Sequence, residues 1–184
     1  MNPGRRTFCI TGLAGLGLAA CGNGIGSNGA ATIDARVEST LQYLFSTYPG
    51  TLDLSNQAAG MLVMPLITEV GLGFGGAFGR GALRIGGATV DYYTAAAASA
   101  GLQIGAQQYS HVLFFMTTEA LQNFRTSPGW VAGAGIDYAI NTEGEMLLAD
   151  TTTSLSPVIA VVFGQTGLRL GATIEGTKYT RIIP

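Results

Sequence analysis

The clearest chemical pattern in the sequence is the run Gly71-Leu72-Gly73-Phe74-Gly75-Gly76, which has the spacing G-x-G-x-x-G. Asp91 lies 20 residues beyond Gly71, as an acidic residue does in dinucleotide-binding sites. Such sites also need a helix after the glycines to hold the pyrophosphate, and Gly79 and Gly81 would destabilise that helix. We therefore interpret the run as a strand. Its alternate glycines would leave one face bare, so that a backbone or side chain can pack closely there.

His111 is the only histidine and would have to serve any Ser-His-Asp triad or zinc site. It begins an apolar run and no G-x-S-x-G motif accompanies it, so we expect a structural, hydrogen-bonded histidine. Glu143 and Glu145 form the nearest carboxylate pair, but they flank a glycine in a polar turn and are expected to be solvated. The sequence thus predicts a protein without a catalytic site, metal or cofactor.

Basic side chains cluster in two parts of the sequence and form the remaining candidate site. They are Arg80, Arg84, Arg169, Lys178 and Arg181. If the two groups meet in space, they form a basic patch that would bind lipid phosphates. The alternative is a set of scattered surface charges.

The composition of the chain limits the classes of protein to which it can belong. The 184 residues are the size of one domain; 47% are hydrophobic and 11% are charged, against about 25% charge in ordinary soluble domains. Disordered chains are polar and charged, so most of this chain is predicted to fold. A formal net charge of −2 argues against a general nucleic-acid partner.

The first 20 residues have the features of an export signal. Arg5 and Arg6 precede an apolar stretch over residues 8–20, which is too short to cross a bilayer but suits a signal peptide. The stretch ends in Leu18-Ala19-Ala20-Cys21, which resembles a bacterial lipobox. That resemblance implies cleavage before Cys21 and attachment of acyl chains such as palmitate to it. An ordinary signal peptide is the alternative.

Acylation at Cys21 would place the protein in the bacterial cell envelope, held on the outer membrane and facing the periplasm or the surface. Residues 22–31 are rich in Gly, Asn and Ser, and we expect them to form a tether. Loss of residues 1–20 removes Arg5 and Arg6, so the mature chain has a formal charge of 7 − 11 = −4.

The domain from residue 32 to 184 is predicted to have an α+β fold. Residues 32–45 carry an apolar stripe at helical spacing, made of Ile33, Val37, Leu41 and Leu44. Gly86-Gly87 lies between two strand-like segments and predicts a hairpin. Further strands follow, interrupted by a short helix over 118–125 with Thr118 as its cap. We expect the N-terminal amphipathic helix to pack on a curved, Gly-rich antiparallel sheet or partial barrel.

The order of the motifs resembles the SYLF domain, a lipid-binding module of eukaryotic membrane-trafficking proteins and of bacterial exported proteins. The resemblance is carried by Gly71–Gly76, Gly79–Arg84, Tyr92-Tyr93, Gly101–Gln107, Phe114–Thr117, Gly129-Trp130, Phe163–Leu168 and Glu175–Tyr179. It implies a non-enzymatic module that binds acidic phospholipids. Lipid contact would come from the five basic residues or from apolar insertion, for which the stripe of Ile33, Val37 and Leu41 is one candidate. A small outer-membrane β-barrel and a periplasmic enzyme are the alternatives.

Overall fold

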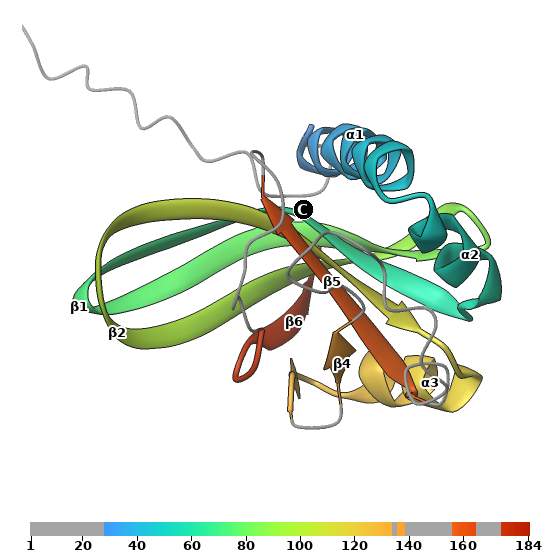
Figure 1. Ribbon diagram of the computed structural model, residues 1–184. Coiled ribbons are helices and arrows are strands. Elements are labelled where there is room, and N and C mark those ends of the chain that lie inside the picture. The colour runs from blue at the N-terminus through green and yellow to red at the C-terminus, as the bar shows by residue number, and fades with distance from the viewer. Residues whose placement is uncertain (1–27, 134–135, 139–155, 165–173) are drawn as a thin grey trace, which may run out of the picture.

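A computed structural model describes residues 28–133, 136–138, 156–164 and 174–184 (Figure 1). The helices are α1 (Gly29–Thr47), α2 (Gly50–Gln57) and α3 (Thr118–Thr126). The strands are β1 (Gly60–Ile85), β2 (Ala88–Phe115), β3 (Trp130–Val131), β4 (Asp137–Tyr138), β5 (Val158–Gly164) and β6 (Lys178–Ile182). Cys21 and Arg169 lie outside the described residues.

The fold is built on one long hairpin. Strands β1 and β2 pair antiparallel from Gly60↔Phe115 to Ile85↔Ala88. Gly86 and Gly87 form the turn with φ of +57° and +82°, a backbone conformation that favours glycine. The hairpin predicted from these two glycines is confirmed.

Strand β2 is the centre of the sheet. Its whole length pairs with β1, its residues 109–115 pair with β5, and its residues 92–96 pair with β6. Strand β3 pairs with β6, and β4 pairs with β5 in the one parallel pairing of the described strands. The sheet curls strongly in Figure 1, and helix α1 lies across one side of it. The α+β class with an N-terminal helix on a curved antiparallel sheet is therefore confirmed.

The hairpin curls so far that the second half of β1 packs against the first half. A Cβ atom on Gly81 would overlap the carbonyl oxygen of Val63, and one on Gly79 would overlap the carbonyl oxygen of Leu66. Glycine is required at both positions because backbone contacts backbone there. The strand segments between the two halves, near residues 68–78 and 96–108, form the bend of the hairpin at the left of Figure 1.

The sheet has two faces, which we call inner and outer. Successive residues of a strand point to opposite faces, but the register irregularities at Met64/Ile67 and Leu83/Arg84 each reset this alternation. In β1 the inner-face residues are therefore even-numbered up to Met64 and odd-numbered from Ile67 to Leu83. The inner face packs around an aromatic cluster that contains Tyr93, Phe115, Phe124, Trp130 and Tyr179. The outer face packs under α1 through Val63, Ala82, Val112, Phe114, Ile159, Val161 and Phe163.

Local details depart from expectation at the helix ends. Helix α1 begins at Gly29, so residues 29–31 belong to the helix and not to a tether. The cap of α3 is Thr117, whose hydroxyl accepts a hydrogen bond from the amide of Ala120 at 3.1 Å, whereas Thr118 was expected. Positions 117 and 118 are both threonine, so the sequence alone does not show which of the two caps the helix.

Candidate functional site

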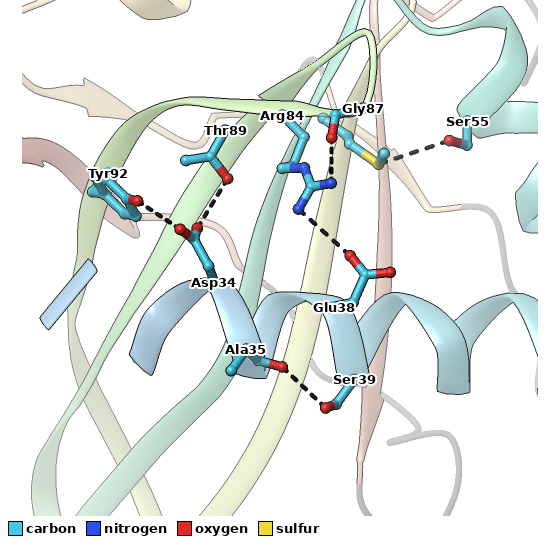
Figure 2. Close-up of polar contacts among 10 residues, drawn as sticks. Asp34, Ala35, Glu38, Ser39, Ser55, Arg84, Gly87, Thr89 and Tyr92 are labelled. Atoms are coloured by element: carbon cyan, nitrogen blue, oxygen red, sulfur yellow. Dashed lines mark hydrogen bonds and ion pairs between the residues drawn. The ribbon is translucent and has the colours of Figure 1, made fainter. Parts of the chain in front are cut away.

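Arg84, one of the predicted lipid-binding cations, is committed to holding α1 on the hairpin (Figure 2). Its guanidinium lies 3.6 Å from a carboxylate oxygen of Glu38 and donates to the carbonyl oxygen of Gly87. The side chain is only 16% exposed. This cation is therefore part of the helix–sheet contact and presents little surface to a ligand.

Asp34 makes the second polar link between α1 and the sheet (Figure 2). One carboxylate oxygen accepts from the Thr89 hydroxyl at 2.9 Å, and the other accepts from the Tyr92 hydroxyl at 2.8 Å. The pKa of Tyr92 is raised, first by burial and then by this hydrogen bond and the charge of Asp34. The Tyr92 hydroxyl therefore stays protonated and keeps donating to Asp34 at neutral pH.

Arg181 lies on the inner side of the sheet, because it pairs with the inner-face residue Tyr93. Its guanidinium is 3.5 Å from Asp91, and the Arg125 guanidinium is 3.1 Å from the same carboxylate. Arg181 is thus separated from Arg84 by the sheet and shares an acidic partner with a cation from α3.

Arg80 and Lys178 lie on the outer face, close to the bend. Arg80 pairs with Thr94, which pairs with Thr180, and the next row on the same face is Phe78, Ala96 and Lys178. Arg80 is half-buried and Lys178 is exposed. Of the predicted basic set, these are the two described members that share one face with exposed apolar side chains.

The apolar stripe of α1 is not available for insertion into a membrane. Ile33, Val37 and Leu41 are buried against the outer face of the sheet, as is Leu44. Any contact through this stripe would require α1 to leave the sheet.

The exposed apolar side chains lie instead on the bend. Val70, Phe74 and Phe78 are 54%, 85% and 51% exposed, and all three point to the outer face because they are spaced four residues apart in β1, an even number. We call these three residues the bend surface. The inner-face positions between them are mainly glycines, in agreement with the predicted bare face of the G-x-G-x-x-G run, which lies within a strand.

The bend surface was missed at the sequence level although the signal was present. A strand whose inner positions are glycine must carry its large side chains on the other face, here Phe74 and Phe78. What the sequence did not reveal is that no described element covers that face at the bend.

His111 has the structural role expected of it. It is buried on the inner face, and its Nε2 lies 2.8 Å from the Tyr179 hydroxyl. Burial lowers the pKa of His111 to about 3, so the ring is neutral at physiological pH. Within the described ranges, no three His, Cys, Asp or Glu side chains come together as a metal site would require. Glu143 and Glu145 lie outside those ranges.

The architecture defines a class: an α+β domain in which one helix covers part of a curled, glycine-dependent hairpin sheet. Residues 96–181 match the family model Ysc84, described as "Las17-binding protein actin regulator". This part of the chain belongs to the SYLF family, and the resemblance is confirmed. The motifs of residues 71–95 lie before the matched range. No curated protein matches the chain.

Proposed function

We propose that the protein is a non-catalytic lipoprotein of the bacterial cell envelope, anchored through Cys21, whose domain binds acidic phospholipid headgroups. Membership of the SYLF family supports the lipid-binding role, and the lipobox-like sequence before Cys21 supports the anchor. No helix among the described residues is both long and apolar enough to cross a membrane.

One observation carries the headgroup proposal: Arg80 and Lys178 share the outer face with Phe78, beyond the area that α1 covers. The mature chain has a formal charge of −4, so attraction to an anionic bilayer must be local and not general. Each cation near an anionic surface contributes about 1 kcal/mol, so two of them give weak binding. An acyl anchor would make weak binding sufficient, because it raises the effective concentration of lipid.

The test is co-sedimentation of residues 22–184 with vesicles of neutral or acidic lipids over a range of salt concentrations. We expect modest binding to acidic vesicles that falls as salt rises. The double change Arg80→Gln and Lys178→Gln should remove most of it. Arg125→Gln with Arg181→Gln changes the net charge equally on the inner side and should have little effect. Equal losses in the two double variants would contradict the proposed headgroup site.

The anchor has a separate test. Cys21→Ser should move the protein from the membrane fraction to the soluble fraction, since each buried methylene of an acyl chain contributes about 0.8 kcal/mol to membrane binding. Cys9→Ser, within the signal, is the matched control and should leave fractionation unchanged. A Cys21→Ser protein that stays with membranes in high salt would contradict acylation as the anchor.

A further inference from the structure

We infer that the bend surface enters the apolar layer of a phospholipid bilayer, with Phe74 as the deepest side chain. This inference rests on the proposed function, because it names the part of the domain that meets the membrane and how it does so.

The first argument is the apolar character of the bend. Phe74 is the most exposed large hydrophobic side chain of the described residues, and Val70 and Phe78 lie four residues to either side of it on the same face. On the partner strand, Ala96 and Ala98 are exposed and lie opposite Phe78 and Gly76. Clustered exposed apolar side chains on an otherwise well-packed domain mark a contact surface.

The second argument is the distribution of charge. The sequence contains no charged residue between Glu69 and Arg80 or between Asp91 and Glu119, so Glu69, at the edge of the bend, is the one charged residue of its two strand segments. Insertion of Phe74 and Phe78 into hydrocarbon therefore requires no charge between Glu69 and Arg80 to be desolvated. Arg80 and Lys178 lie at the border of this uncharged region and on its outer face.

The apolar side chains lie on the bend, and the cations lie next to them on the side of the hairpin turn. An acidic bilayer has the matching order, with its hydrocarbon inside and its phosphates at the surface. Acyl chains would contact the bend surface while phosphates lie beside Arg80 and Lys178. A second copy of the protein fits less well, because bend-to-bend contact brings the same cations of both copies together. Charge complementarity therefore favours lipid as the occupant.

The third argument is the length of chain between the proposed anchor and the domain. Six residues lie between Cys21 and Asn28, where the described structure begins, and the seven steps from Cys21 to Asn28 span at most about 25 Å. An anchored domain is thus held within reach of the bilayer, with the start of α1 nearest the anchor. In Figure 1 this blue end of α1 is turned toward the bend.

The experiment places a tryptophan at the bend of the full chain. The protein is isolated from membranes with its anchor and reconstituted into vesicles that contain brominated acyl chains, which quench tryptophan on contact. Phe74→Trp is the reporter and Leu52→Trp, at an exposed position of α2, is the matched control. The parent chain, with Trp130 packed against Phe124, supplies the baseline.

We expect the Phe74→Trp protein to show emission shifted to shorter wavelength and strong quenching by the brominated lipid. The Leu52→Trp protein should add solvent-exposed emission that the brominated lipid does not quench. The loss of emission on contact with lipid should therefore be the same as in the parent chain. A protein that stays with the vesicles but shows no quenching at position 74 overturns the insertion and leaves the proposed function standing. A protein that does not stay with vesicles overturns both.

A second reporter guards against local effects of the substitution. Phe78→Trp should be quenched as well, and adding Phe74→Asp should abolish that quenching, while adding Leu52→Asp should not. If the Phe74→Trp protein is unquenched and a Phe74→Cys protein cross-links efficiently to position 74 of another copy, the occupant is a second copy and the lipid inference is wrong.

Discussion

The outer face of the sheet has two regions that differ in what covers them. Under α1, residues such as Val63 and Ala82 are fully buried, whereas Phe74 on the same face of the same strand is almost fully exposed. Helix α1 has 19 residues and is about 28 Å long, while half of the 26-residue strand β1 spans about 43 Å. One helix therefore cannot cover the hairpin from the turn to the bend. The region beyond its reach carries the side chains for which we propose a membrane contact.

The largest effect is expected where the hairpin packs on itself. Gly81→Val should prevent folding, because the new side chain would overlap the backbone at Val63 and the sheet could no longer curl. Gly133→Ala is the control, since no atom lies within 4 Å of a Cβ at that position. Circular dichroism and solubility measure both. Normal folding of the Gly81→Val protein would contradict the backbone contact on which both regions depend.

Removal of an apolar side chain should change the free energy of unfolding much more in the region under α1 than at the bend. Leu44→Ala should lower the free energy of unfolding by about 3 kcal/mol, because it leaves a cavity under α1. Phe74→Ala should change it by less than about 0.5 kcal/mol, because little surface is buried at the bend. Urea denaturation measures both values. Equal costs would mean that the bend is packed and not available for a ligand.

Acid should destabilise the domain through the inner core. The region under α1 and the bend should therefore lose stability equally. His111 is neutral in the fold with a pKa of about 3, whereas the unfolded chain takes up a proton near pH 6.5. Stability is therefore present above pH 6.5 and falls by up to about 1.4 kcal/mol per pH unit between pH 6.5 and 3. His111→Gln should flatten this part of the curve of unfolding free energy against pH. An unchanged slope in the variant would assign the acid sensitivity to other groups.

The polar links of α1 should contribute least. Asp34→Ala removes the acceptor of two hydroxyl groups and should cost about 1 kcal/mol. Glu38→Gln breaks an ion pair in which Glu38 is largely exposed, and it should cost less than about 0.5 kcal/mol. Thermal unfolding of the two variants ranks them. The reverse ranking would mean that Arg84, and not the Asp34 hydrogen bonds, is the main polar attachment of the helix.

Local patterns predicted the local parts of this structure. The stripe of Ile33, Val37 and Leu41 predicted the covered face of α1, and Gly86-Gly87 predicted the turn. The contacts between distant segments were not predictable in the same way. The approach of Gly81 to Val63 and the ion pair of Arg84 with Glu38 depend on how far the hairpin curls, and no short-range pattern encodes that amount of curl.

The dependence on contacts between distant segments also explains why only part of the predicted basic site lies on one face. Arg80, Arg84, Lys178 and Arg181 were grouped by their positions along the chain, but strand alternation and the position of α1 decide which of them face the same way. The structure leaves Arg80 and Lys178 together on the outer face and directs Arg84 and Arg181 to separate acidic partners. The basic site therefore stays a prediction for Arg80 and Lys178.

Amide hydrogen exchange with and without acidic vesicles tests the central claim most directly. The account predicts that vesicles slow exchange in residues 68–80 and 94–108 and leave α1, at residues 29–47, unchanged. Protection centred on α1, or faster exchange in the strands beneath it, would show that the helix and not the bend meets the membrane, and would contradict the account.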